Sequence, residues 1–244
     1  MTEISRRAIL GTTAASTFIA AAMAQDKVAK PETIAIIGTG NVGATLGKAW
    51  AAKGHRIIYG SRNPGSEKSV QLGMDTGNGA KVLTQPEAAA SADIVLLAAP
   101  SQVALSLIAS LGDLSGKILI DAMNEMSFKD NKLIEPDDSV GLAARIQAKV
   151  PAAFVVKAFN ATNARVMSGP KTVTGGPVTV PLAGADDKTR ARVAALATAI
   201  GFDVLDMGGA EALKQVEHLG RIYVAYAVTH RPQRLELNFR TWKA

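Results

Sequence analysis

A short apolar run that ends in a glycine turn is the feature that most constrains the fold of this chain. Residues 34–43 read Ile-Ala-Ile-Ile-Gly-Thr-Gly-Asn-Val-Gly, and a helical pattern follows them. In such a G-x-G-x-x-G turn, Gly38 makes the bend, Gly40 lets the backbone touch a pyrophosphate, and Gly43 lets the helix pack on the strand. The N–H groups at the helix N-terminus attract an anion. With a second strand about 20 residues further on, the turn predicts a dinucleotide-binding site.

The end of the second expected strand indicates which dinucleotide binds. This strand, residues 55–60, leads into Ser61 and Arg62, and the first acidic residue after it is Glu67. A site that prefers NAD has Asp or Glu here, which accepts hydrogen bonds from the ribose 2′-OH. A hydroxyl and a guanidinium suit a 2′-phosphate instead, and Lys68 adds a second positive charge nearby. The residues therefore predict NADP(H), with a solvated arginine at a strand end as the alternative.

Residues 1–24 have the features of an export signal and not of a folded domain. Ser5-Arg6-Arg7 is a twin-arginine pattern, a mild apolar stretch follows, and Ala22-Met23-Ala24 offers a cleavage site. The apolar part is too short to form a stable membrane span. We therefore expect a periplasmic protein. An ordinary secretory signal and a retained cytoplasmic tail are the alternatives.

The composition narrows the possible chemistry. The chain has no cysteine, which excludes thiol catalysis and Cys-ligated metal centres, and its histidines at 55, 218 and 230 show no ligand spacing. There is no convincing Ser/His/Asp set either, so we expect neither a metal site nor a catalytic side chain. The net charge of +6 comes from scattered Lys and Arg with few aromatic residues. That distribution argues against nucleic-acid binding.

Strand and helix patterns alternate along the chain, which predicts an α/β fold with a Rossmann-type doubly wound parallel sheet. We expect this NADP-binding domain over residues 25–165 and a small α/β extension packed on it over residues 166–244. A glycine-rich stretch at residues 73–79 precedes the third strand, and Thr84 begins a helix pattern. The expected strands cover residues 34–38, 56–60, 80–83, 93–98, 117–121, 153–158, 178–183 and 202–206. The expected helices cover residues 41–53, 103–111, 139–149, 187–200 and 210–229.

The last expected helix carries an apolar stripe. Leu213, Val216, Leu219 and Ile222 recur in it at helical spacing. Such a stripe indicates packing against the core or against a second copy of the chain, and not a ligand-binding surface. A homodimer is therefore a candidate assembly.

A doubly wound sheet binds its ligands at the carboxyl ends of the strands. Pro100, after the fourth strand, fixes a turn whose backbone can lie against a cofactor, or simply ends the strand. Asn160 and Asn163 are candidate amide partners of a nicotinamide or an acceptor, whereas Asp121 and Asn124 are interpreted as caps. The candidate cofactor-binding residues are Gly38, Thr39, Gly40, Asn41, Val42, Gly43, Ser61, Arg62, Lys68, Ala99, Pro100, Ser101, Phe159 and Asn160.

An ordered set of motifs resembles the NADP-binding oxidoreductase family of the deazaflavin (coenzyme F420)-dependent NADP reductases. It is also similar to the NADPH domain of six-transmembrane metalloreductases. The resemblance covers residues 33–225, and the matching segments are 38–43, 60–62, 93–100, 155–160, 183–187, 201–208 and 216–219. It implies hydride transfer between NADP(H) and a small-molecule redox acceptor, a flavin or a deazaflavin. In such a transfer the protein orients two rings, and no side chain need act as acid or base.

Two departures from that family fall near the expected acceptor site. Ser101 follows Pro100 where deazaflavin reductases tend to have a bulky residue, and Met123 and Glu125 flank Asn124 where many relatives have Thr and Pro. Two other functions therefore remain open. One is an imine reductase of the pyrroline-5-carboxylate type, which usually has a large helical dimerisation domain. The other is a non-catalytic NADP-binding or partner-binding module, because the periplasm is not expected to regenerate NADPH.

Overall fold

The computed structural model describes residues 30–129, 132–134, 140–230 and 233–242. The predicted export signal, residues 1–24, lies outside the described residues. Residues 31–244 form one of two units of the chain, and the elements below belong to it. Among the described residues, no helix combines the length and the apolar character that a membrane span needs.

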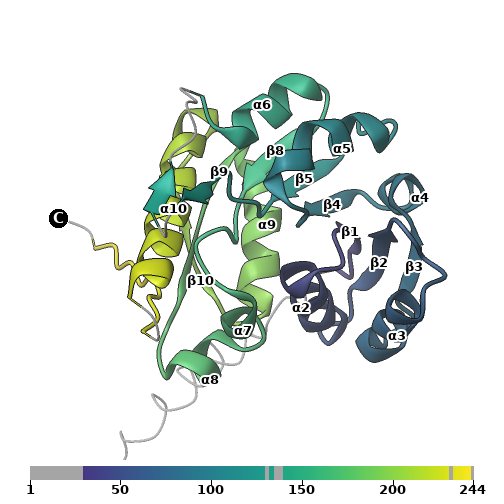
Figure 1. The fold of residues 1–244 in the computed structure, drawn as a ribbon, viewed down its shortest axis with the longest axis horizontal. Helices are drawn as coiled ribbons and strands as arrows, with labels where there is room; N and C mark the ends of the chain where they lie inside the picture. Colours follow the sequence, from purple (N-terminus) through teal and green to yellow (C-terminus); the bar gives the residue numbers. More distant parts are fainter. Residues whose placement is uncertain (1–29, 130–131, 135–139, 231–232, 243–244) are drawn as a thin grey trace, which may run out of the picture. The chain divides into compact units, whose positions relative to one another are not determined.

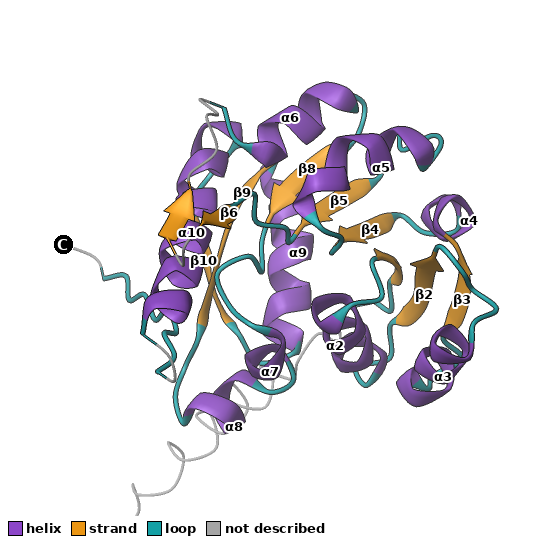
Figure 2. Ribbon diagram, in the orientation of Figure 1, coloured by secondary structure: helices purple, strands orange, loops and turns teal. Residues whose placement is uncertain are grey.

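Eight strands form one sheet, in the spatial order β10-β9-β8-β5-β4-β1-β2-β3 (Figures 1 and 2). Six of them run parallel, which confirms the Rossmann-type doubly wound fold. The strands of the expected C-terminal extension, β9 and β10, continue the same sheet. The bounds are β1 Thr33–Ile37, β2 Arg56–Ser61, β3 Lys81–Thr84, β4 Ile94–Leu97, β5 Ile118–Asp121, β8 Phe154–Lys157, β9 Thr179–Gly184 and β10 Asp203–Asp206.

The direction of the last two strands differs from the prediction of a parallel sheet. β9 pairs antiparallel with β8, and β10 pairs parallel with β9. The connection between β8 and β9 holds only two short helices, α7 (Ala164–Met167) and α8 (Pro170–Thr174). A parallel neighbour needs a crossover helix that runs back along the sheet. Without one, β9 begins at the sheet edge where β8 ends.

Helices cover both faces of the sheet. On one face α2, α7 and α9 pack on one apolar cluster, and on the other α4, α5, α6 and α10 pack on a second cluster. Ile34 and Ile36 of β1 point to the first cluster, and Ala35 and Ile37 to the second. This is the period-two alternation of a strand buried on both faces. The further helix bounds are α2 Asn41–Ala51, α3 Glu67–Thr76, α4 Gln85–Ala90, α5 Ala104–Ser110, α6 Leu142–Lys149, α9 Asp187–Ala199 and α10 Leu213–Thr229.

Besides α7 and α8, a helix and a hairpin were not predicted. The helix is α3, which takes in the start of the glycine-rich stretch and ends at Thr76, and Ser66 caps it by accepting a hydrogen bond from the Ser69 N–H at 3.3 Å. Gly73 stands in this helix where an added Cβ would lie 3.3 Å from a Val82 methyl group, so the helix comes close to β3. The second element is a hairpin of β6 (Ser127–Lys129) and β7 (Lys132–Ile134).

The apolar stripe of α10 is only partly in the core. Leu213 and Val216 are buried, whereas Ile222 is 57% exposed. The buried face of α10 instead includes two charged residues, Glu217 and Arg221. Packing against the core is therefore confirmed for Leu213 and Val216, and packing of Ile222 against a second copy of the chain stays a prediction.

Candidate functional site

A cavity of about 790 Å³ lies at the carboxyl ends of β1, β2 and β4. The predicted residues that line it are Gly38, Thr39, Gly40, Ser61, Arg62, Lys68, Ala99 and Pro100. Sequence reasoning missed other lining residues because they belong to α3, α4 and α5 or to the loops before them. These are Asn63, Ser66, Ser69, Gln85, Val103, Ser106, Leu107 and Ser110.

In the glycine turn, Gly38 and Gly43 are closely packed, whereas Gly40 has open space beside it. A Cβ on Gly38, whose φ is +123°, would lie 2.4 Å from the Ala98 carbonyl oxygen, and a Cβ on Gly43 would lie 2.0 Å from the Gly38 carbonyl oxygen. A Cβ on Gly40 would meet no atom within 4 Å. The turn is thus pressed against its own helix and against the loop after β4, while Gly40 faces the cavity side without obstruction.

The N-terminus of α2 has no side-chain cap. Its N-cap residue is Gly40, no side chain accepts a hydrogen bond from the first turn, and that turn has no acidic residue. The first N–H groups of a helix have no partner within the helix. Beside a cavity they form an anion site, to which the helix dipole adds a partial positive charge.

The loop after β2 is shaped by serine hydroxyls. The Ser61 hydroxyl lies 3.0 Å from the Ser69 hydroxyl and accepts a hydrogen bond from the Asn63 N–H at 3.1 Å. Ser61 is 8% exposed, so its hydroxyl mainly orders the loop. The two cationic side chains of this loop, Arg62 and Lys68, are exposed at the cavity. They, and not Ser61, are the groups that can reach a phosphate freely.

Some predicted cofactor residues lie away from the cavity wall. Asn41 and Val42 start α2, and Ser101 is buried at the start of a short 3₁₀ helix, Ser101–Val103. The Phe159 side chain is 2% exposed and packs edge-on against Trp50, with ring centroids 5.8 Å apart. Because its φ is +65°, the chain turns sharply after β8 at this residue. The Phe159 side chain therefore belongs to the core and is not available to a ligand in this cavity.

Asn160 belongs to an amide pair that links the loops after β5 and β8. Its Nδ2 donates to the Val216 carbonyl at 2.9 Å and to Asn124 Oδ1 at 3.3 Å, and Asn124 Nδ2 donates to the Asn160 carbonyl at 2.7 Å. Asn160 is 1% exposed, and its Oδ1 has no hydrogen-bond partner. A Cβ on Gly220 of α10 would lie 2.3 Å from Asn160 Nδ2, so the helix lies directly against this pair.

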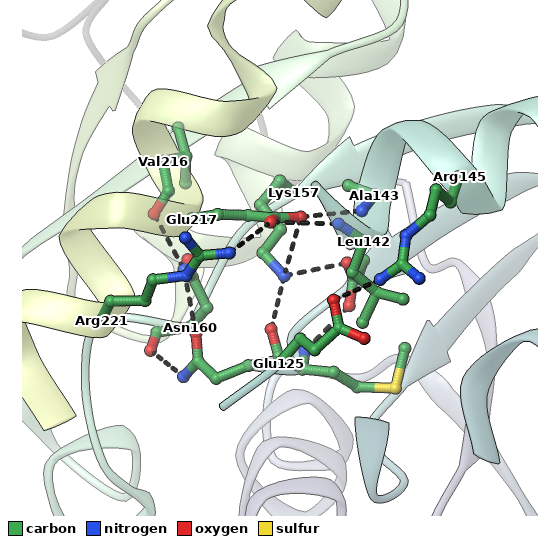
Figure 3. Close-up of polar contacts among 12 residues, drawn as sticks. Glu125, Leu142, Ala143, Arg145, Lys157, Asn160, Val216, Glu217 and Arg221 are labelled. Atoms are coloured by element: carbon green, nitrogen blue, oxygen red, sulfur yellow. Dashed lines mark hydrogen bonds and ion pairs between the residues drawn. The ribbon is translucent and has the colours of Figure 1, made fainter. Parts of the chain in front are cut away.

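A buried ionic cluster lies beside the amide pair (Figure 3). Lys157 and Asp121 are both fully buried, and Lys157 Nζ donates to Asp121 Oδ2 at 2.9 Å and to the Met123 carbonyl. Glu217 of α10 accepts hydrogen bonds from the first N–H groups of α6, and its Oε1 lies 3.9 Å from Lys157 Nζ. As predicted for a cap at the end of the strand, Asp121 Oδ1 accepts from the Met123 N–H at 2.9 Å, and its ion pair with Lys157 was not predicted. A sequence pattern cannot reveal such pairs, because they depend on the register between strands.

The other predicted amide, Asn163, has a structural task. It caps α7 and donates hydrogen bonds to the Tyr223 hydroxyl at 2.7 Å and to the Glu236 carboxylate at 3.0 Å. Burial raises the pKa of Glu236, which the Thr162 and Tyr223 hydroxyls partly offset. The C-terminal segment is thereby tied to the loop after β8. Among the described residues there is no cluster of three or more His, Asp or Glu side chains that suits a metal ion.

Sequence comparison finds one family and several relatives. Residues 33–125 match the family described as NADP oxidoreductase coenzyme F420-dependent. The chain is 36% identical over 96 residues to the F420-dependent NADP reductase of Methanothermobacter thermautotrophicus, which is 36% of this chain and 41% of that protein. It is 29% identical over 185 residues to metalloreductase STEAP3 of Rattus norvegicus, which is 75% of this chain and 35% of that protein. The chain thus spans less than half the length of these two relatives.

Structure comparison agrees with the sequence relatives. A putative F420-dependent NADP reductase from Arthrobacter sp. FB24 is similar with a TM-score of 0.74 and 27% identity, covering 84% of this chain and 99% of that one. A reductive aminase from Aspergillus terreus is similar with a TM-score of 0.58 and 17% identity, covering 81% of this chain and 63% of that one. The likeness to the aminase concerns the fold alone.

Proposed function

We propose that this chain, whose residues 33–125 match the family of F420-dependent NADP oxidoreductases, transfers a hydride between NADP(H) and a flavin or deazaflavin acceptor. The match to this family and to the F420-dependent NADP reductase supports an NADP-dependent oxidoreductase. The acceptor is the finer part of the proposal.

The residues around the cavity fit the nucleotide. The uncapped N-terminus of α2 and the open space at Gly40 suit a pyrophosphate, and Arg62 and Lys68 suit a 2′-phosphate. An acidic residue at the end of β2 would repel that phosphate, and none stands there. The observation that carries the proposal is this pairing of a bare helix N-terminus with two exposed cations at one cavity.

The task of this chain in the reaction is orientation. When bound, NADPH supplies a hydride, which carries two electrons to the acceptor and leaves NADP⁺. The glycine turn and the loop after β2 fix the phosphates, and the loops after β4, β5 and β8 lie along the same edge of the sheet. Holding two reactants at contact distance supplies much of the rate enhancement of such a transfer. No side chain needs to donate or accept a proton at the reacting carbon.

We further propose that the protein acts in the periplasm on a small-molecule acceptor. The twin-arginine pattern supports this location, and that export route carries folded proteins, so the nucleotide can be bound before export.

The proposal is tested with purified wild-type protein in two steps. NADPH binding is measured by the fluorescence of the reduced nicotinamide, and NADPH oxidation is then followed with FMN, a deazaflavin and pyrroline-5-carboxylate as acceptors. We expect binding, and oxidation with a flavin or deazaflavin. Oxidation only with pyrroline-5-carboxylate would support an imine reductase, and binding without any oxidation a non-catalytic module. Absence of NADPH binding would contradict the proposal altogether.

A further inference from the structure

The buried pair of Lys157 and Asp121 lies where the redox site is expected. The two residues are direct neighbours in the register of β8 and β5, at the carboxyl ends of both strands. β5 also pairs in parallel with β4, and β4 with β1, so these ends share one sheet edge with the glycine turn. The ion pair is therefore on the ligand-binding edge of the sheet, at the ends of the two strands that follow β4 in the sheet order.

Asp121 and Lys157 together bind the backbone N–H and C=O of Met123, in the loop after β5. Asp121 Oδ1 accepts a hydrogen bond from the Met123 N–H at 2.9 Å, and Lys157 Nζ donates to the Met123 carbonyl. With its N–H and its C=O both bound, this residue fixes the direction in which the chain enters Asn124. Asn124 is partly exposed and is joined to the buried Asn160 by two hydrogen bonds.

Several features of this cluster oppose stability and call for a reason other than stability. Burying an ion pair costs desolvation, and apolar residues of similar volume often do as well or better. Asn160 Oδ1 has no partner although it is buried, which is itself unfavourable. Gly220, a poor helix former, stands in the middle of α10, where a Cβ would clash with the amide pair. A polar network that lowers stability at a ligand-binding edge indicates that these side chains must be placed accurately for function.

We propose that Lys157 is a positioning residue for hydride transfer. Together with Asp121 it fixes the segment 122–125 and, through that segment, the Asn124–Asn160 amide pair beside the reacting rings. The inference rests on the proposed function, because it assigns these groups to that same site. Lys157 itself is fully buried and need not touch either reactant.

The test removes the ion pair without leaving a lone buried charge. In the double variant Lys157→Met/Asp121→Asn the net charge is unchanged, and the carbonyl oxygen of Asn can still accept from the Met123 N–H. We expect NADPH to bind within about twofold of wild type, because the phosphate contacts lie on other loops. We expect the single-turnover rate of NADPH oxidation by FMN or a deazaflavin to fall by about 100-fold, the scale on which a misplacement of about 1 Å acts.

A matched control lies at the carboxyl end of β9. Arg190 is 7% exposed, binds Asp206 at 2.8 Å and donates to the carbonyls of Gly184, the last residue of β9, and of Ala185 in the loop that follows. It thus holds backbone carbonyls as Lys157 does. Gly184 pairs with Val156, but because β9 runs antiparallel to β8 the loop after β9 leaves the sheet in the direction opposite to the loops after β5 and β8. Arg190→Met/Asp206→Asn should lower the melting temperature and leave the transfer rate per folded molecule unchanged.

Hydrogen exchange supplies a readout that needs neither nucleotide nor acceptor. We expect faster amide exchange over residues 122–126 in the Lys157/Asp121 variant, with exchange over residues 38–43 unchanged, and faster exchange over residues 184–187 in the control. Asn124→Ala, which keeps the ion pair, should slow transfer in the same way and also serves if the double variant does not fold.

Two outcomes would overturn the inference. One is an unchanged exchange rate over residues 122–126, and the other is a transfer rate no lower than that of the Arg190/Asp206 control. Failure of the wild-type protein to bind NADPH would instead contradict the proposed function, and the exchange experiment would still decide whether Lys157 orders the loop.

Discussion

Arg62 is exposed at the cavity that we propose for the nucleotide, after a strand that has no acidic residue. A hydrogen bond to a charged group contributes about 1.5–3 kcal/mol, or about 10- to 100-fold in affinity. We therefore expect Arg62→Ala to weaken NADPH binding by that factor and to leave NADH binding nearly unchanged, as measured by fluorescence titration. Arg56→Ala, at the other end of β2, is the control and should change neither. An equal loss for both nucleotides would argue against a 2′-phosphate contact.

Substitutions at Gly40 and Gly43 should separate effects on NADPH binding from effects on the stability of the fold. A Cβ on Gly40 enters open space, so Gly40→Ala should keep the melting temperature within about 4 °C of wild type and weaken NADPH binding by about tenfold or more. A Cβ on Gly43 would lie 2.0 Å from a carbonyl oxygen, so Gly43→Ala should lower the melting temperature far more. The two variants are compared by thermal unfolding and by nucleotide titration. Unimpaired NADPH binding by Gly40→Ala would exclude this turn as the phosphate site.

The raised pKa of the half-buried Glu236 carboxyl predicts the direction in which the stability of the fold changes with pH. Burial raises its pKa, and Thr162, Asn163 and Tyr223 surround it. A carboxyl whose folded pKa is raised contributes stability below its usual pKa and loses that contribution as pH rises through the folded pKa. Relative to Glu236→Gln, wild type should therefore lose melting temperature as pH increases through this window. A difference in melting temperature between wild type and Glu236→Gln that stays constant with pH would contradict this prediction.

At the scale of elements, Gly220 decides how closely α10 packs. Alanine is the better helix former by about 1 kcal/mol. At this position, however, its Cβ would lie 2.3 Å from Asn160 Nδ2, and overpacking costs about 1–3 kcal/mol. We expect Gly220→Ala to lower the free energy of unfolding in urea. Gly73→Ala in α3 meets only a side-chain methyl at 3.3 Å and should stay within about 0.5 kcal/mol of wild type.

Helices and strands with strong local signals were predictable from the sequence, but the direction of β9 in the sheet was not. β1 and α2 follow from an apolar run and a glycine turn, and α4 from a capping box in which the Thr84 N–H donates to Glu87 Oε2 at 3.0 Å. α3 was missed because Gly73 lies inside it and Gly77 follows its last residue, whereas the close approach of Gly73 to β3 is a tertiary contact that the sequence does not show. The antiparallel course of β9 depends on the connection before it, and the residues of the strand itself carry no sign of it.

The same division holds for the candidate site. The loops at residues 38–40, 61–62 and 99–100 were predictable, because each follows a strand with a strong local signal and parallel strands end at the same edge of the sheet. The link between Lys157 and Asp121 needs the register of two strands, and that between Lys157 and Glu217 needs the docking of α10. Phe159 was assigned to the site because it follows β8, but its positive φ turns its side chain into the core.

For the whole molecule, we propose that residues 1–24 direct export by the twin-arginine route. This route depends on the arginine pair, so Arg6→Lys/Arg7→Lys in the full chain should abolish appearance of the protein in the periplasm. Cell fractionation followed by immunodetection measures this, with Arg56→Lys as the control for general effects of such a change. Unaltered export of the paired variant would point to an ordinary secretory signal.

Because β9 and β10 run opposite to the other six strands, the loops that follow them lie at the other end of the sheet from the loops after β1, β2 and β4. Loops that follow these strands open away from the nucleotide, and Lys188, at the start of α9, is exposed there. A dye, a surface tether or a fused domain attached there would leave the opposite edge, where we propose that hydride transfer takes place, free. The molecule can thus be anchored through one side without covering the proposed site.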